Sequence, residues 1–229
     1  MYPKYALAAL IVLMPLGAAD FWHEKKFTEW SEKQARRLLE GSPWARAVAI
    51  PADGGRSRRR VGDDLSDATQ PGRRSRSNVP SAPEAPPATT AILRWHTALP
   101  LKQAIARLRF GDAAASAPDA VQMLSRQEDR YVLAVTNLPP AVLRASADEL
   151  LPRMRLRIKG KPDIVAERIQ ADRQERSVDI YLIFPKGRDG SAVIELSDGE
   201  VEVALDFGDL KISRKFKLKE MVFGGKLEI

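Results

Sequence analysis

The side chains that could carry out catalysis are few in this chain of 229 residues. It contains no cysteine and only two histidines, His23 and His96. A catalytic thiol and a cysteine-bound zinc site are therefore excluded. A serine triad would need one of the two histidines, but no serine lies in a Gly-x-Ser-x-Gly motif. His96 is the better candidate, although a lone histidine at the end of a strand more often has a structural role. We assign no catalytic residue and expect no enzyme activity.

Carboxylates are plentiful, so a pair that cleaves a polymer by general acid and base chemistry stays open as an alternative. Most of these acids stand where a strand or helix would face water. Asp63, Asp64 and Asp67 are spaced somewhat like a calcium loop but lack its glycine and its distant glutamate. The sequence therefore predicts no metal site and no cofactor.

A row of basic residues on a predicted strand is the most notable surface feature. Apolar and basic residues alternate through the segment, so Arg153, Arg155, Arg157 and Lys159 would share one face. Such a row could bind an anionic polysaccharide, a phosphate or a lipid head group. The alternative is a strand whose neighbours in the sheet supply the matching acids.

The tryptophans near the N-terminus also allow two interpretations. Trp22, Trp30 and Trp44 could form a platform on which sugars stack. We prefer to interpret Trp30 and Trp44, together with Leu38 and Leu39, as anchors that dock this segment on a sheet.

The segment that holds these anchors predicts one helix and one strand. Residues 31–34 form a Ser-x-x-Gln capping box that begins the helix, and Gly41 is placed to end it in a left-handed conformation. Residues 44–50 predict the strand. An isolated helix of this length is marginal in water, so the segment must dock on the C-terminal part of the chain.

The next segment, residues 51–88, is rich in proline, arginine and serine and almost free of large apolar residues. It cannot bury enough surface to offset the entropy of ordering, so we predict a disordered linker. Its arginine clusters at 56–60 and 73–76 leave binding to an anionic surface as a weaker option. No aromatic residues are interleaved for base stacking, and the net charge of +7 is spread along the chain. We therefore expect no specific nucleic-acid partner.

Residues 89–229 predict one globular domain of mainly β structure. A short helix is expected at 101–109, followed by a loop of small residues, and a second short helix opens at the capping box Ser146-x-x-Glu149. Strands are expected near 91–97, 130–137, 153–159, 164–170, 177–184, 192–196, 200–207 and 210–218. Antiparallel strands at such spacing predict an immunoglobulin-like β-sandwich with short helices.

The last two strands allow a prediction of register. Gly208 and Asp209 suit a two-residue hairpin turn. Pairing outward from that turn places three acids opposite three lysines, namely Asp206 with Lys211, Glu202 with Lys215 and Glu200 with Lys217. Arg214 then falls in the apolar row opposite Val203, which suggests an edge position, a side chain that reaches solvent, or a bulge.

The first 19 residues have the three regions of a secretory signal peptide: Lys4, an apolar stretch at 5–16, and the small residues Gly17, Ala18 and Ala19. An uncleaved anchor is the alternative, because the apolar run is shorter than the roughly 20 residues that span a bilayer. We expect an exported protein, periplasmic or extracellular, with no transmembrane span after cleavage of the signal. The predicted parts are the signal 1–19, the helix-strand segment 20–50, the linker 51–88 and the β-sandwich domain 89–229.

Two quoted segments carry a resemblance to a known family. The stretch FTEWSEKQARRLLEGSPWAR, which follows the predicted signal, and the ending FKLKEMVFGGKLEI resemble a family of exported bacterial proteins of unknown function. The resemblance spans both predicted ordered parts and skips the linker. It implies export and a two-part organisation, and it brings no catalytic residues.

We therefore predict a non-catalytic binding or scaffolding module of the bacterial cell envelope, because β-sandwiches present surfaces and loops. Its partner is unknown, and an envelope protein or an anionic polymer would fit. The alternative is a carboxylate-dependent hydrolase that acts on envelope polymers. A cleft with two carboxylates about 5 to 10 Å apart would favour the hydrolase, whereas a flat basic row would favour binding.

Overall fold

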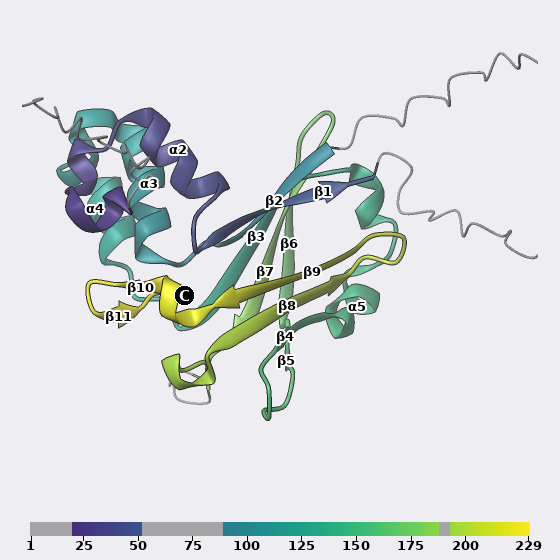
Figure 1. Cartoon of the computed structure of the whole chain (residues 1–229). Coiled ribbons are helices and arrows are strands. Elements are labelled where there is room, and N and C mark those ends of the chain that lie inside the picture. Colours follow the sequence, from purple (N-terminus) through teal and green to yellow (C-terminus); the bar gives the residue numbers. More distant parts are fainter. Residues whose placement is uncertain (1–19, 52–88, 188–192) are drawn as a thin grey trace, which may run out of the picture.

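The structure is a computed structural model that describes residues 20–51, 89–187 and 193–229 (Figure 1). The predicted signal segment and the predicted linker beyond Pro51 lie outside the described residues. The described chain is mainly β, with antiparallel sheets and short helices, as predicted.

The larger sheet has five strands in the order β1-β2-β3-β7-β6, and every neighbouring pair is antiparallel. Its strands are β1 (Ala45–Ile50), β2 (Thr89–Trp95), β3 (Arg130–Leu138), β6 (Arg168–Arg173) and β7 (Val178–Pro185). The predicted N-terminal strand is β1, and it pairs along its whole length with β2. The N-terminal segment therefore docks on the C-terminal part of the chain, as predicted.

The smaller sheet has four strands in the order β5-β4-β8-β9. Its strands are β4 (Met154–Arg157), β5 (Ile164–Val165), β8 (Glu200–Asp206) and β9 (Lys211–Lys217), and a separate hairpin follows from β10 (Val222–Phe223) and β11 (Lys226–Leu227). One hydrophobic cluster takes in buried residues of both sheets. For example, the rings of Trp95 in β2 and Phe216 in β9 meet edge to face, with 5.9 Å between their centroids. Two antiparallel sheets around one core are compatible with the expected sandwich.

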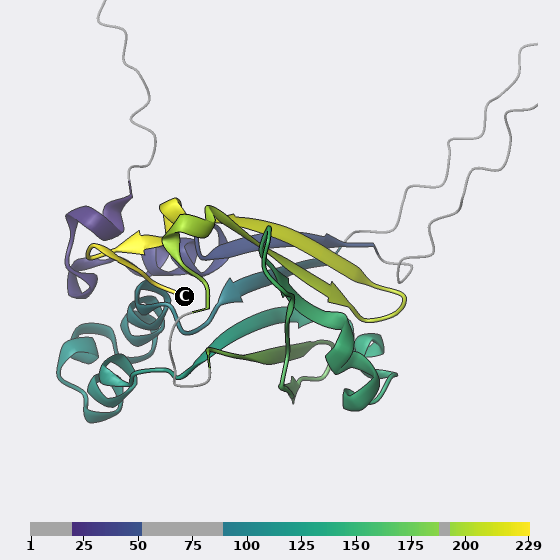
Figure 2. The ribbon, with the colours of Figure 1, turned by 90° about the horizontal axis from the view of Figure 1, so that it is seen from below.

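The helices gather at the two ends of the strands (Figures 1 and 2). One end carries α1 (Phe21–Glu24), α2 (Glu32–Glu40), α3 (Leu99–Phe110) and α4 (Pro118–Ser125), and the other end carries α5 (Ala147–Leu150). Single 3-10 turns occur at Phe27–Glu29, Gly111–Ala115, Pro140–Leu143, Leu151–Arg153, Leu196–Asp198 and Leu218–Met221. Both predicted capping boxes are present, because the backbone N–H groups of Gln34 and Glu149 donate to the hydroxyls of Ser31 and Ser146.

Three local predictions were wrong. Helix α4 occupies part of the predicted loop of small residues, with Pro118 in its first turn and Ala120 buried beneath it. Gly41 does follow α2, but its φ of −154° is negative, so its conformation is not left-handed. The strand expected at 192–196 is absent from its described part, 193–196, where the N–H groups of Val193 and Ile194 both donate to the Tyr131 hydroxyl at 3.1 Å.

The strand predicted at 164–170 divides between the two sheets. The N–H of Ala166 donates to Met154 O in the smaller sheet at 3.0 Å, whereas the N–H of Glu167 donates to Ile183 O in the larger sheet at 2.8 Å. The chain therefore crosses from the smaller sheet to the larger sheet between Ala166 and Glu167. The predicted strand is divided there into β5 and β6.

The predicted register of the last hairpin is confirmed, with Asp206 opposite Lys211, Glu200 opposite Lys217 and no bulge at Arg214. One ion pair joins diagonal rather than directly opposite residues: Lys215 is opposite Glu202, but its Nζ lies 2.6 Å from Glu200 Oε1. Arg214 is half-buried, and its guanidinium donates to the Ser213 carbonyl at 2.8 Å.

Replacement of Trp44 tests whether the N-terminal segment belongs to the same cooperative unit. Trp44 is fully buried, and its Nε1 donates to Glu228 O at 2.8 Å. Trp44→Ala should lower the free energy of unfolding by about 3 to 5 kcal/mol, measured by denaturant unfolding. Val121→Ala, at a side chain that is 47% exposed, is the control and should change it by less than about 0.5 kcal/mol. Equal effects of the two substitutions would contradict the docking.

Candidate functional site

The predicted basic row lies on and beside β4, the second strand of the smaller sheet. Arg155 and Arg157 belong to the strand, whereas Arg153 ends the 3-10 turn before it and Lys159 lies beyond its last residue. Asp163 Oδ2 lies 3.3 Å from Arg155 Nη1 and 3.5 Å from Arg157 Nε. The next strand, β8, places Glu202 opposite Arg157.

These contacts fit the alternative in which neighbouring segments supply acids to the basic strand. One carboxylate is shared by the two central arginines, so an anionic ligand would have to compete with Asp163. A binding role for Arg153, Arg155, Arg157 and Lys159 stays a prediction.

The predicted docking anchors lie in the core. Trp30, Leu38 and Trp44 are fully buried, and Leu39 is partly buried against the same cluster. Trp22 is also buried, and its ring meets that of Trp44 edge to face at 6.0 Å. Sugar stacking requires an exposed ring face, so this arrangement supports packing rather than a sugar platform.

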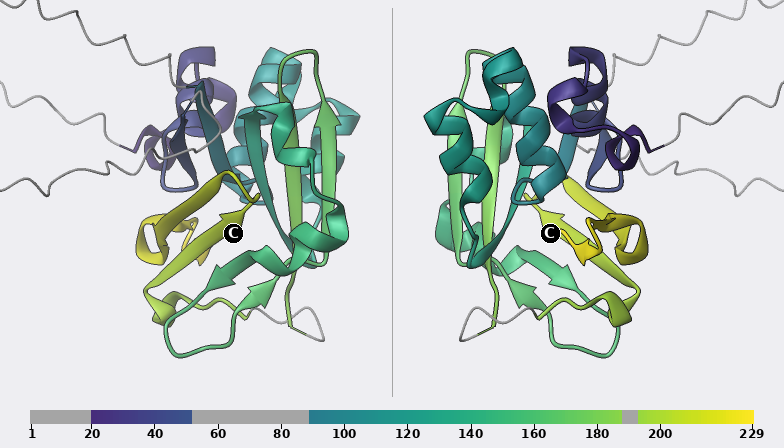
Figure 3. Two further views of the ribbon diagram at one scale, coloured as in Figure 1. Left: turned by 90° about the vertical axis from the view of Figure 1, so that its right-hand side faces the viewer. Right: turned by 90° about the vertical axis from the view of Figure 1, so that its left-hand side faces the viewer.

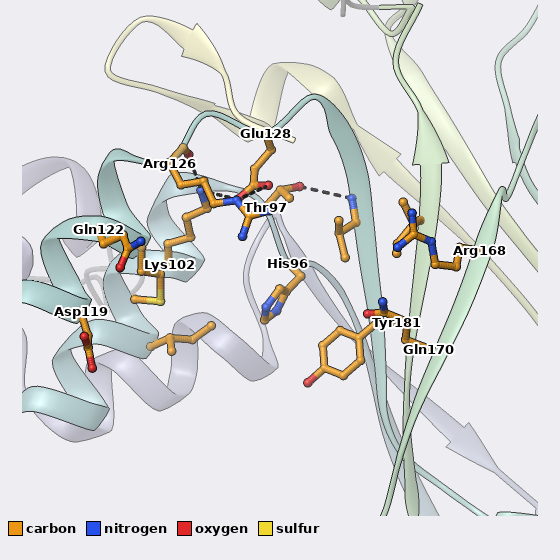
Figure 4. Close-up of a pocket in the computed structure, with 14 residues that line it drawn as sticks. His96, Thr97, Lys102, Asp119, Gln122, Arg126, Glu128, Arg168, Gln170 and Tyr181 are labelled. Atoms are coloured by element: carbon orange, nitrogen blue, oxygen red, sulfur yellow. Dashed lines mark hydrogen bonds and ion pairs between the residues drawn. The ribbon is translucent and has the colours of Figure 1, made fainter.

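A pocket of about 720 Å³ lies elsewhere, between the larger sheet and helices α3 and α4 (Figure 4). Side chains from both sides enclose it: His96, Thr97, Lys102, Ile105, Asp119, Gln122, Met123, Arg126, Glu128, Val132, Arg168, Gln170, Tyr181 and Ile183. Sequence reasoning missed this pocket, although it singled out His96.

The sheet side of the pocket follows from the alternation of side chains along each strand. Leu93 and Trp95 of β2 are buried in the core, so Arg94 and the following His96 project from the outer face. On the neighbouring strands, Tyr181 stands opposite Gln170 and Ile183 opposite Arg168. Polar and apolar side chains therefore mix on this face.

A buried ion pair forms the helix side of the pocket. Lys102, in α3, is only 7% exposed. Its Nζ lies 3.0 Å from Glu128 Oε1 and donates to Arg126 O at 2.9 Å. The second carboxylate oxygen of Glu128 lies 3.5 Å from Arg126 Nε. Both oxygens of Glu128 therefore face cations, and this network ties the end of α4 to α3.

His96 stands between the two sides, and Figure 4 shows its ring directed into the space between the helices and the sheet. Burial lowers the pKa of His96 to about 4, and the positive charge of Arg94 adds to the effect. Glu128 opposes the shift and Lys102 supports it. The imidazole is therefore neutral at physiological pH. Its Nδ1 is buried without a hydrogen-bond partner, and its ring meets Tyr181 edge to face at 5.3 Å.

Two guanidinium groups on the same face also lack ion-pair partners among the described residues. Arg94 is half-buried, and burial lowers the pKa of its guanidinium. Its Nε is buried without a hydrogen-bond partner. Arg168 is exposed at the far side of the pocket. Of the two, Arg168 lines the pocket and could donate to an anionic group of a ligand there.

The groups in the pocket are therefore suited to binding. They comprise the neutral imidazole of His96 with its unsatisfied Nδ1, the ion pair of Lys102 with Glu128, and Arg168, which makes no ion pair among the described residues. Among the residues that the structure describes, no group of three or more His, Asp or Glu side chains could hold a metal ion. Within the same residues, no helix is both long and apolar enough to span a membrane.

Comparison with known proteins adds no functional information: no family model, curated protein or solved structure matches this chain. The resemblance carried by the N-terminal and C-terminal segments thus stays an expectation.

Titration of His96 tests its environment. Its folded pKa of about 4 lies below the ordinary value of 6.5, so the unfolded chain binds the proton more tightly. The contribution of His96 to stability is complete above pH 6.5 and is lost as the pH falls toward 4, by about 1 to 2 kcal/mol between pH 7 and pH 5. His96→Gln should remove that part of the pH dependence of the unfolding free energy.

The matched control for this titration is His23→Gln, which removes an exposed ring. Protonation of carboxylates in acid destabilises both variants alike. The difference between their unfolding free energies therefore reports the contribution of His96. A His96 ring that titrates near pH 6.5 in an NMR experiment on the folded protein would contradict the prediction.

Proposed function

We propose that this chain is an exported, non-catalytic binding module of the bacterial cell envelope, and that its ligand binds in the pocket between the larger sheet and helices α3 and α4. The observation that carries the proposal is the unsatisfied polar lining of that pocket. His96, in that lining, has its Nδ1 buried without a partner, which costs free energy unless a ligand or solvent satisfies it. Arg94 Nε is likewise buried without a partner, on the same face of the sheet but outside the lining.

The lining favours a ligand that carries a negative charge. Lys102, Arg126 and Arg168 contribute three positive charges, whereas Asp119 and Glu128 contribute two negative ones. Glu128 already faces two of the cations. The free donors suit a carboxylate or a phosphate, both of which occur on envelope polymers.

Apolar side chains in the same pocket suit the carbon skeleton of such a ligand. Ile105 and Met123 project from the helices, and Val132 and Ile183 from the sheet. A mixed lining with a few placed polar groups is typical of pockets that bind small groups or polymer segments.

The start of the chain supports the proposed location. Its basic, apolar and small-residue regions are those of a secretory signal peptide. Fractionation of the native cells should find the protein outside the cytoplasm, with a mass that corresponds to cleavage after Ala19.

A carboxylate-dependent hydrolase is the second candidate, because Asp119 and Glu128 line the same pocket. A hydrolase of this kind needs one carboxyl group that can donate a proton. Both oxygens of Glu128 are already engaged in ion pairs, with Lys102 and Arg126. Binding therefore accounts better for the arrangement.

Retention on purified peptidoglycan sacculi tests the proposed function. The protein should pellet with the sacculi, and the bound fraction should fall as salt is added. Arg126→Gln should weaken binding by about threefold to tenfold, because it removes one charge that faces the pocket. Arg144→Gln is the matched control: the two side chains are 73% and 76% exposed, and each lies in one carboxylate pair.

The same assay separates the two candidates. Binding without release of soluble fragments supports the binding module. Release of fragments that stops with Asp119→Asn would establish the hydrolase instead. Failure to bind the sacculi, or equal losses with Arg126→Gln and Arg144→Gln, would contradict the assignment of the pocket.

A further inference from the structure

Strand β6 is an edge of the larger sheet, and its outer side faces away from the molecule (Figure 3). Within the described residues, it pairs with β7 on one side and with no strand on the other. Every side chain of β6 except that of Ile169 is exposed. An edge strand of this kind presents free N–H and C=O groups to any strand that can match it.

The charges on β6 lack ion-pair partners within the described chain. Arg168, Asp172 and Arg173 make no ion pair there, whereas the lysines of β9, an edge strand of the smaller sheet, pair with acids of β8 and of the following turn. Asp172 is opposite Asp179 on β7. Like charges at opposite positions destabilise a sheet, so a cation on the free side of Asp172 would be stabilising.

The sequence of the edge is complementary to itself when it is reversed. We consider two antiparallel copies of residues 167–173 with Gln170 opposite Gln170. Arg168 is then opposite Asp172, and Arg173 is opposite Glu167, whose carboxylate also pairs with Arg130 at 3.0 Å. Each of these charge pairs occurs twice by symmetry, and Ile169 is opposite Ala171 on the other face.

Neighbouring registers lose this match. When a strand pairs with its own copy across a two-fold axis, the register can change only in steps that keep each side chain on the same face of the sheet. With Ala171 at the axis, Arg168 meets Gln174 and Asp172 meets Gln170. With Asp172 at the axis, two aspartates meet. Only the register centred on Gln170 opposes every charge of the edge with its opposite.

We propose that two copies of this chain associate through β6, in antiparallel register about Gln170, so that their larger sheets join into one continuous sheet. Charged side chains on an edge often serve to block such pairing. A blocking role does not require opposite charges to face each other across a two-fold axis, whereas association of two copies does.

The contact is short, which limits its strength. An edge of seven residues buries less than the roughly 1,200 Å² that stable interfaces usually bury, so the dimer forms with rising protein concentration. Arg168 also lines the pocket, so the second copy would place its Asp172 beside that margin of the site.

Sedimentation velocity of the purified protein, from low micromolar to millimolar concentration, tests the association without any ligand. The outcome is therefore independent of the proposed function. The protein should dimerise, and Arg168→Asp and Asp172→Arg should each weaken the dimer about tenfold or more, because each change opposes like charges at two positions. Arg176→Asp, an exposed reversal in the β6–β7 turn, is the matched control and should leave the dimer intact.

The two single variants provide the decisive comparison. When they are mixed, the carboxylates of the Arg168→Asp copy meet the guanidinium groups of the Asp172→Arg copy, so a heterodimer should form. The double variant should dimerise by itself for the same reason. Circular dichroism establishes that each variant is folded. A protein that stays monomeric at all concentrations, a dimer that both reversals leave unchanged, or variants that fail to recombine would overturn the proposal.

Discussion

The burial of the N-terminal tryptophans against the C-terminal end of the chain is the contact on which the rest of the structure depends. Trp44 donates to the Glu228 carbonyl and meets the ring of Phe223 edge to face. The Glu228 side chain in turn accepts from the Leu99 N–H, at the start of α3. One small cluster thus joins the N-terminal segment, the last residues and the helix that forms one side of the pocket. Loss of this burial would free β1 and would also misplace α3.

The pocket shows how burial and charge act together on one surface. Lys102 is placed in α3 where its Nζ reaches Glu128 and the end of α4, so the pair fixes the distance between two helices. A charge buried with a good partner contributes more to geometry than to net stability. His96 has no such partner and is kept neutral. The site therefore combines a rigid side with groups whose hydrogen-bonding capacity is unused.

Much of the fold could be predicted from local pattern. The capping box at residues 31–34, the strand that becomes β1 and the register of β8 with β9 all depend on near neighbours in the sequence. The predictions that failed depend on contacts between residues far apart in the sequence. Val193 and Ile194 look like a strand, but their N–H groups are taken by Tyr131, about 60 residues away. The pocket was missed for the same reason, because its lining comes from five separate elements and from the segments that follow β2 and α4.

The meeting of Ile50 with Thr89 at the end of the first strand pair has a consequence for how this chain can vary. The chain leaves the sheet after Ile50 and returns to it at Thr89, so the pairing already holds the two ends of the intervening stretch together. For any flexible connection whose ends are held together in this way, doubling the length costs only about 0.6 kcal/mol of loop-closure entropy. The β1–β2 pairing therefore sets no narrow limit on the length of a flexible connection between Ile50 and Thr89.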